Sequence, residues 1–273
     1  FPTRRSSDLE PVVYDHHPAT EGKPAAAKAE LAGLGVAVRD GWTEGFDEDL
    51  IVTSPGVPRR SPTLLRAIEE GREVISEVEF AYRISKAPIV AITGTNGKST
   101  TTVMAYLIAR GAGLDAILCG NIYGSGYDER PLSEAAADAT GDQVLIAEIS
   151  SFQLEWVRDF KPVAAGITNI GWDHMDRYQS VEEYAEAKQQ IFAAQGEGDY
   201  AVVREGDPVV KKPTGPRVLT FGASGEHGRV MEDRLEVLGA SIPFVTLPFH
   251  ETHNYLNAAM ALLLVSGLRA HVT

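Results

Sequence analysis

Short apolar runs, each followed by a polar turn and an amphipathic stretch, dominate the chain from residue 89 onward. Uninterrupted apolar runs at 89–92 and 144–147 are typical of strands buried on both faces of a parallel sheet. Helical patterns follow at 99–110, 181–194 and 254–265. This alternation predicts an α/β unit with a mostly parallel sheet. The expected strands are 89–93, 115–119, 143–149, 163–169, 200–203 and 217–221, followed by a meandering β segment at 229–247.

The first part of the chain has fewer elements. Strands are predicted at 10–15, 35–39 and 50–53, and helices at 25–34 and 61–70. Asp15 ends the first strand, as an acidic residue does in a dinucleotide-binding domain, but a glycine-rich turn should lie about 20 residues earlier. The segment 1–9 has neither a strand pattern nor a glycine. We therefore expect a truncated Rossmann-like domain over 1–87, whose first nine residues are non-native, and a second domain over 88–273.

The composition narrows the classes of function. The 273 residues are 44% hydrophobic and 23% charged, as in an ordinary globular protein. With 25 basic and 38 acidic residues, the net charge of −13 argues against a general nucleic-acid binder. The single cysteine, Cys119, fits a reducing compartment, and no apolar run approaches the ~20 residues of a membrane span. We predict a cytoplasmic protein that binds neither nucleic acid nor a membrane.

A glycine turn between a buried strand and an apolar helix carries the strongest chemical signal. Backbone N–H groups of such a turn point toward a polyphosphate. A lysine there supplies positive charge to the terminal phosphates, and one of the two hydroxyls after it would ligate Mg²⁺. The general phosphate-loop pattern places a further glycine at Ile92. An ordinary glycine turn is the alternative interpretation. The turn consists of Gly94, Thr95, Asn96, Gly97, Lys98, Ser99 and Thr100.

Each of five further side chains has two interpretations, one as a ligand-binding residue and one as an ordinary structural or solvated residue. Glu148 ends a buried strand, where a carboxylate would face the ligand crevice and bind Mg²⁺, or would be a solvated acid. His174 is a metal ligand or a hydrogen-bonding loop residue. Spacing alone predicts that Lys188 is a solvated lysine on a helix. Asn254 and Asn257 share a helix face that would read an adenine edge, unless Asn254 is only an N-cap.

In this order, the motifs resemble those of the Mur ligases, the ATP-dependent amide ligases of peptidoglycan precursor synthesis. The resemblance runs from about residue 50 to the end and includes the phosphate turn without its outer glycine. The segments 120–122, 148–154 and 169–177 resemble the D-glutamate-adding branch. Folylpolyglutamate synthase shares the phosphate turn, but Ser-Ser-Phe-Gln at 150–153 argues against it.

The resemblance implies a role for each candidate residue. Lys98, Lys188 and His174 would be catalytic, and Lys188 would be carbamylated by CO₂. Mg²⁺ would be held by Thr100, Glu148 and His174. ATP would be bound by Gly94, Thr95, Asn96, Gly97, Lys98, Ser99, Thr100, Asn254 and Asn257. UDP-N-acetylmuramoyl-L-alanine would be bound by Asp15, Ser54, Pro55, Gly56, Asn121 and Ser151.

The implied reaction has two steps. The alanyl carboxylate first forms an acyl phosphate with ATP, and the amine of D-glutamate then displaces phosphate to give an amide. The family's third domain, which supplies most D-glutamate contacts, has no counterpart before Thr273. We therefore expect a monomeric fragment that does not complete ligation. A nucleotide-binding module without turnover is the alternative.

Overall fold

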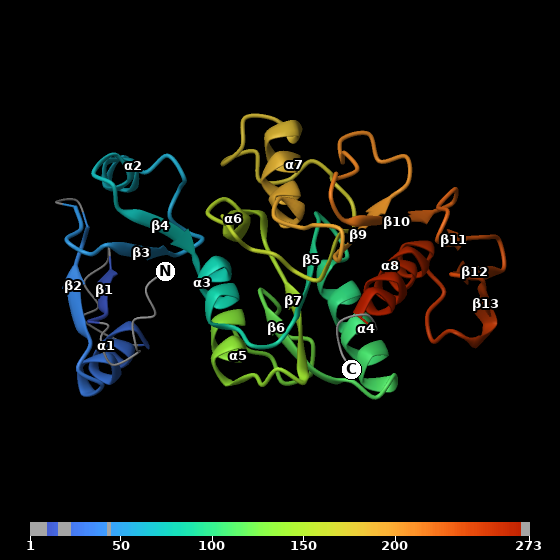
Figure 1. The fold of residues 1–273 in the computed structure, drawn as a ribbon, viewed down its shortest axis with the longest axis horizontal. Helices are drawn as coiled ribbons and strands as arrows, with labels where there is room; N and C mark the ends of the chain where they lie inside the picture. Colours follow the sequence, from blue (N-terminus) through green and yellow to red (C-terminus); the bar gives the residue numbers. More distant parts are fainter. Residues whose placement is uncertain (1–9, 16–22, 43–44, 269–273) are drawn as a thin grey trace. The chain divides into compact units, whose positions relative to one another are not determined.

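The computed structural model describes residues 10–15, 23–42 and 45–268 (Figure 1). Contacts divide the chain into two compact units. The smaller unit comprises Phe1–Ile51 and Arg60–Val74, and the larger comprises Val52–Arg59 and Ile75–Thr273. The expectation about 1–9 falls outside the described residues, and the domain division at 87–88 stays a prediction. In the described ranges, none of the helices is long and apolar enough to cross a bilayer.

The smaller unit contains a β–α–β arrangement. Strand β1 (Val12–Asp15) pairs in parallel with β2 (Ala37–Asp40), and helix α1 (Lys23–Gly33) lies between them in the sequence. A helix joining parallel strands is the repeating element of Rossmann-like folds, which agrees with the predicted fold class. Helix α2 (Pro62–Glu69) has proline at its start. Strands β3 (Leu50–Thr53) and β4 (Glu73–Ser76) form a separate two-stranded sheet.

The larger unit is built on a nine-stranded sheet over the described residues, in the order β13-β12-β11-β10-β9-β8-β5-β7-β6. All neighbouring pairs from β6 to β11 are parallel, and β12 and β13 are added antiparallel at one end. The predicted α/β class with a mostly parallel sheet is therefore confirmed. The strands are β5 (Ile89–Thr93), β6 (Asp115–Gly120), β7 (Gln143–Glu148), β8 (Ala164–Ile167), β9 (Tyr200–Arg204), β10 (Arg217–Gly222), β11 (Gly228–Val230), β12 (Arg234–Val237) and β13 (Ala240–Pro243).

Helices cover both faces of this sheet, which explains the unbroken apolar runs. Ile89 and Ala91 belong to a core formed with helices α3 and α5, whereas Val90 and Ile92 belong to a core formed with α4 and α8. Successive side chains of a strand point to opposite faces, so a strand covered on both sides has no polar position. Figure 1 shows α4 beside α8, and α3 beside α5. The four helices are α3 (Glu77–Ile84), α4 (Lys98–Gly111), α5 (Leu132–Asp138) and α8 (Thr252–Leu268).

Four elements were not predicted from the sequence: β4, α3, α5 and the one-turn helix α6 (Ser151–Leu154). One available signal was a serine followed three residues later by glutamate, which is typical of a helix start. Ser76 indeed caps α3, because its Oγ accepts a hydrogen bond from the N–H of Glu79 at 3.3 Å. The helix expected at 181–194 is shorter, since α7 (Val181–Gln189) continues only as a 3₁₀ turn, Gln190–Phe192.

Candidate functional site

Three loops meet because of the strand order in the larger unit. β5 lies between β7 and β8, and all three run in parallel. Ile92 of β5 is therefore in register with Glu148 on one side and Gly166 on the other. The phosphate turn after β5, the end of β7 and the loop after β8 consequently lie at one edge of the sheet. Parallel sheets bind ligands at this carboxyl edge.

The phosphate turn requires glycine at two positions. Gly94 has φ of 146° and Gly97 has φ of 82°, in the region that side chains disfavour. A Cβ at Gly94 would overlap the Thr168 hydroxyl, and a Cβ at Gly97 would lie 2.6 Å from Asn257 Oδ1. Helix α4 begins directly after Gly97, at Lys98. The close approach of neighbouring side chains therefore selects both glycines, while Ile92 stays in the core.

The loop after β8 supports the turn through several hydrogen bonds, among them one from the Gly171 N–H to Thr95 Oγ1 at 2.9 Å. The Thr95 N–H donates to the Asn169 carbonyl at 2.9 Å. The Thr168 hydroxyl and the Asn169 amide both donate to the Asn96 carbonyl, at 2.7 and 2.9 Å. The Asn96 N–H donates to Asn169 Oδ1 at 3.2 Å. The sequence predicts no role for Thr168, and it singles out Asn169 only as the first residue of the segment 169–177, because local pattern does not show which loops meet.

Lys98 and the two hydroxyls after it occupy different environments. Lys98 Nζ donates to the Thr95 carbonyl at 2.9 Å, so the ammonium lies over the turn. Ser99 hydrogen-bonds the carboxylate of Glu148. Both Ser99 and Thr100 are exposed. The contact with Glu148 favours Ser99 as the hydroxyl ligand, and the assignment of Thr100 to the metal stays a prediction.

Glu148 is a buried carboxylate with incomplete hydrogen bonding. The residue is only 3% exposed, and its Oε2 has no hydrogen-bond partner among the described residues. Burial raises the pKa of this carboxyl, while the hydrogen bond from Ser99, the charge of Lys98 and a hydrogen bond from Asn121 act in the opposite direction. A buried oxygen of this kind is normally paired. Its position beside the phosphate turn suits a divalent cation such as Mg²⁺.

Lys188 on α7 is buried, which corrects the solvated side chain that spacing alone predicted. It is 1% exposed. Its Nζ donates to Thr93 Oγ1 at 3.3 Å and lies 4.6 Å from the centre of the Tyr184 ring. Burial, followed by the charge of Lys98, lowers the pKa of Lys188 to about 7, against the opposing effects of Asp173 and Glu148. A substantial fraction of this amine is therefore neutral near pH 7.

His174 lies in the loop after β8, near Asp173, Phe152 and Tyr184. Its φ of 54° is unusual for a residue with a side chain. Nε2 lies 3.5 Å from Asp173 Oδ2, and the ring centre is 4.8 Å from that of Phe152 and 6.0 Å from that of Tyr184. In the ranges that the structure describes, no three His, Cys, Asp or Glu side chains are already arranged around a common metal position. The metal role of His174 stays a prediction.

The two asparagines of α8 lie next to each other, and Asn257 lies beside the phosphate turn. Asn257 Nδ2 donates to Asn254 Oδ1 at 3.4 Å, so the two amides share a helix face. Asn257 also packs against Gly97. Because α8 begins at Thr252, Asn254 lies inside the first turn and is not the N-cap. Its Nδ2 donates to Glu251 Oε2 at 3.1 Å.

The expected substrate residues lie in different places. The Asn121 N–H donates to the Glu148 carbonyl at 2.8 Å, and Ser151 is buried and hydrogen-bonds Tyr178. Both therefore belong to the surroundings of the phosphate turn. Asp15 ends β1 in the smaller unit. The remaining three, Ser54, Pro55 and Gly56, follow β3 in a segment that belongs to the larger unit.

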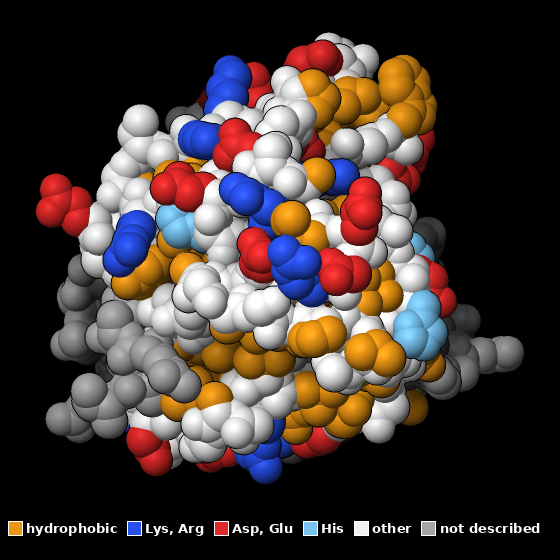
Figure 2. All heavy atoms as spheres, turned by 90° about the vertical axis from the view of Figure 1, so that its right-hand side faces the viewer, with side chains coloured by type: hydrophobic (Ala, Val, Ile, Leu, Met, Phe, Trp, Pro, Cys, Tyr) orange, Lys and Arg blue, Asp and Glu red, His pale blue; other side chains and the backbone are white. Residues whose placement is uncertain are grey.

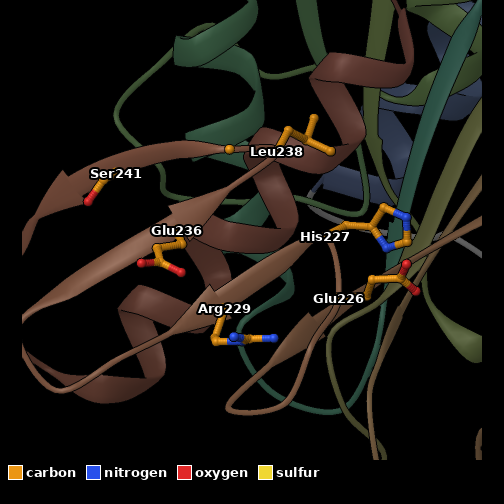
Figure 3. Close-up of a pocket in the computed structure, with 7 residues that line it drawn as sticks. Glu226, His227, Arg229, Glu236, Leu238 and Ser241 are labelled. Carbon is orange, nitrogen blue, oxygen red and sulfur yellow. The ribbon is translucent and has the colours of Figure 1, made fainter.

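A separate hollow of about 320 Å³ lies at the β11–β13 end of the sheet and contains no predicted site residue (Figure 3). Both acidic and basic side chains line it, and acidic and basic side chains are likewise interspersed on the face shown in Figure 2. Glu236 already pairs with Arg234, with Nε and Oε1 3.0 Å apart. This mixture does not select an anion or a cation. The hollow is lined by Glu226, His227, Arg229, Glu236, Leu238, Gly239 and Ser241.

Comparison with known proteins identifies the family of this site. The family model described as the Mur ligase middle domain matches residues 92–265. A UDP-N-acetylmuramoylalanine--D-glutamate ligase of Trichlorobacter lovleyi is 43% identical over 189 residues, which cover 68% of this chain and 41% of that protein. The enzyme of the same name from Thermoanaerobacter sp. is 42% identical over 214 residues, 75% of this chain and 45% of that protein. The chain thus spans less than half the length of these relatives.

Solved structures agree on the fold. The UDP-N-acetylmuramate:L-alanyl-gamma-D-glutamyl-meso-diaminopimelate ligase from Neisseria meningitides has a TM-score of 0.57 at 14% identity, over 96% of this chain and 89% of that chain. MurF from Acinetobacter baumannii has a TM-score of 0.56 at 16% identity, over 84% of this chain and 59% of that chain. At these identities, the likeness concerns the arrangement of helices and strands.

Proposed function

The chain belongs to the Mur ligase family, and we propose that it carries the ATP site of a UDP-N-acetylmuramoyl-L-alanine:D-glutamate ligase. The observation that carries this proposal is the meeting of three features at one sheet edge. These are the phosphate turn, the unpaired oxygen of Glu148 and the buried, partly neutral Lys188. The names of the relatives support the choice of substrates.

In the first proposed step, an oxygen of the alanyl carboxylate attacks the γ-phosphorus of ATP, and ADP leaves. Lys98 and the N–H groups at the start of α4 hold the phosphates, because backbone donors and a helix N-terminus attract anions. Mg²⁺ would be held by Glu148 with Thr100 or Ser99 and His174, and would neutralise phosphate charge when bound. Asn254 and Asn257 bind the adenine. Positioning and electrostatics do most of the work in phosphoryl transfer.

We propose that Lys188 is carbamylated. The neutral amine attacks the carbon of CO₂, one C=O electron pair moves to oxygen, and the amine loses a proton to water. The product is a carbamate anion in place of an ammonium. A buried lysine loses its charge readily because burial disfavours the charged form. The low pKa and the nearby Lys98 support this proposal, since the new negative charge would interact favourably with the Lys98 ammonium.

In the second proposed step, the amine of D-glutamate attacks the acyl carbon of the acyl phosphate. The tetrahedral intermediate collapses to the amide, phosphate leaves and the amine loses a proton. Asn121 and Ser151 contact the muramoyl part, and Ser54, Pro55 and Gly56 contact the UDP part. We propose that the enzyme works as a cytoplasmic monomer, and that its product supports cell-wall synthesis, cell shape and division.

ATP binding tests the site directly. In equilibrium binding with labelled ATP and Mg²⁺, Lys98→Ala should weaken affinity at least ~10-fold, because a charge-assisted contact to phosphate is lost. Lys86→Ala is the matched control, since Lys86 is an exposed lysine outside the turn. Equal affinity for ATP in both variants would refute the phosphate-turn assignment.

A ligation assay tests the reaction. The chain is incubated with ATP, Mg²⁺, UDP-N-acetylmuramoyl-L-alanine and D-glutamate, and amide product is measured. The sequence predicts that this stretch of chain binds ATP without completing ligation. Amide formation at an appreciable rate would contradict that prediction and support the full ligase activity.

A further inference from the structure

One arginine connects the loop of His174 to the segment that contains Ser54, Pro55 and Gly56. Arg177 forms a two-pronged ion pair with Glu155, with Nε to Oε1 at 3.0 Å and Nη2 to Oε2 at 2.6 Å. Its remaining side-chain hydrogen bonds go to backbone carbonyls. Nη1 donates to the Pro55 carbonyl at 2.8 Å, and Nη2 donates to the Val57 carbonyl at 3.1 Å.

The surroundings hold this guanidinium in one orientation. The Arg177 side chain is 13% exposed, and that of Glu155 is 3% exposed. The guanidinium carbon lies 4.2 Å from the centre of the Phe152 ring. The Tyr178 hydroxyl donates to Glu155 Oε1 at 2.8 Å. Buried, bidentate and stacked arginine contacts are stronger and more directional than exposed ion pairs, so this cluster is a fixed junction.

The segment Val52–Arg59 is an exception in the division of the chain. It belongs to the larger unit, although the residues before and after it belong to the smaller unit. Arg177 supplies two hydrogen bonds that hold it there, and Arg59 adds a contact over the Trp156 ring at 5.9 Å. Arg177 lies three residues after His174 in the same loop. One side chain therefore fixes both loops.

We propose that Arg177 is a positioning residue that holds the Ser54–Gly56 turn in register with the His174 loop, and thereby sets the affinity for the sugar nucleotide. The proposal rests on the proposed function, in which that turn contacts UDP. Arg177 reaches the turn through backbone carbonyls, which leaves the side chain and N–H groups of the turn for a ligand. The phosphate turn itself is held by Thr168 and Asn169 and not by this junction, so the affinity for ATP without a bound cation should depend little on Arg177.

The test uses Arg177→Lys, which keeps the charge but loses the planar fork of donors. Hydrogen–deuterium exchange should become at least ~10-fold faster at the amides of Ser54, Gly56 and Val57. Calorimetric affinity for UDP-N-acetylmuramoyl-L-alanine should fall ~10- to 100-fold, the range for loss of a supporting contact. Affinity for ATP in the presence of EDTA, where no cation links His174 to the phosphates, should change less than about twofold. Arg229→Lys, an exposed arginine on β11, is the matched control.

The possible outcomes separate the proposals. Exchange and sugar-nucleotide affinity equal to wild type would overturn the positioning role of Arg177. Equal losses of both affinities, with a changed circular dichroism spectrum, would also overturn it in favour of a general structural role. If wild type fails to bind the sugar nucleotide, this stretch of chain does not carry the proposed sugar-nucleotide site by itself, and exchange at 54–57 still decides whether Arg177 fixes the turn. Glu155→Gln should give the same pattern with a smaller change, because the carbonyl contacts remain.

Discussion

Two buried carboxylates in the larger unit, those of Glu79 and Glu148, differ in how completely they are hydrogen-bonded. Glu79 on α3 has no exposed surface. Its Oε2 accepts hydrogen bonds from the backbone N–H groups of Arg158, Asp159 and Phe160, at 2.8, 3.0 and 3.0 Å. Its Oε1 accepts from Arg83 Nε at 2.9 Å. Glu148 at the end of β7 is almost as deeply buried, yet its Oε2 has no partner among the described residues.

The difference separates a structural carboxylate from a ligand-binding one. A buried charge is tolerated when hydrogen bonds and an opposite charge replace the lost water. Glu79 has both and fixes the turn at 158–160 to α3. The raised pKa of Glu148 shows that its charged form is incompletely compensated. The same comparison applies to Lys188, whose lowered pKa has burial as its main cause. Uncompensated groups of opposite sign at one sheet edge indicate a site for a charged ligand.

Removal of the paired carboxylate should have the largest effect. Glu79→Ala should lower the free energy of unfolding by about 3–5 kcal/mol, because it leaves the Arg83 charge and three backbone N–H groups without their buried acceptor. Urea denaturation followed by circular dichroism measures this loss. Glu134→Ala, at an exposed position of α5, is the control and should change stability by less than about 0.5 kcal/mol. Equal effects of the two substitutions would contradict the structural role of Glu79.

Removal of the uncompensated cation should have an effect of opposite sign. The folded pKa of Lys188 is lowered to about 7 from 10.5. Above pH 10.5 the amine is neutral in both states, and no charge is buried. As the pH falls toward 7, only the unfolded chain gains the proton, so stability is lost. Lys188→Met should therefore raise the free energy of unfolding at pH 7 by a few kcal/mol, roughly.

The pH dependence separates this effect from a change in packing. The difference between Lys188→Met and wild type should shrink as the pH rises from 7 to 10, measured as urea midpoints in CO₂-free buffer. A difference that stays constant across this range would mean that packing alone is responsible. Added bicarbonate should narrow the gap at pH 7.5, because carbamylation stabilises wild type only. Intact mass should then show one CO₂ adduct, which the variant lacks.

The sequence alone predicts the position of Glu148, but it does not predict the burial of Lys188 or the partners of Glu79. Buried runs located β5 and β7, and the end of β7 located Glu148, because the apolar run of a buried strand and the residue that ends it are local features of the sequence. Lys188 could not be found from its helix, since its burial depends on Thr93 and Tyr184. Only the family resemblance singled it out. The local sequence around Glu79 predicts only a residue in the first turn of a helix. The backbone N–H groups that its carboxylate accepts hydrogen bonds from lie about 80 positions later in the chain. Tertiary pairing of this kind leaves no periodic signal.

Neutralisation of the unpaired carboxylate should have the smallest effect on stability, and the most informative one. Burial raises the folded pKa of Glu148 above its usual value. Below the unfolded pKa the carboxyl is neutral in both states, and stability is lost as the pH rises through the folded pKa. Glu148→Gln should therefore match wild type near pH 4 and be the more stable of the two at pH 7. Lower stability of the variant at pH 7 would show that Oε2 is paired after all.

Without ligand, Glu148→Gln should be more stable than wild type, and added Mg²⁺-ATP should reverse this order of stability. A carboxylate with only a structural role would not cause such a reversal. A ligand that binds only the folded state stabilises it in proportion to its affinity. If Glu148 holds Mg²⁺ beside the phosphates, saturating Mg²⁺-ATP should raise the unfolding midpoint of wild type more than that of Glu148→Gln. Glu134→Gln is the control and should respond like wild type. ATP with EDTA should give similar shifts in all three proteins, because the missing carboxylate then has no cation to bind. Equal shifts with Mg²⁺ present would instead leave the unpaired oxygen of Glu148 without a role in metal binding.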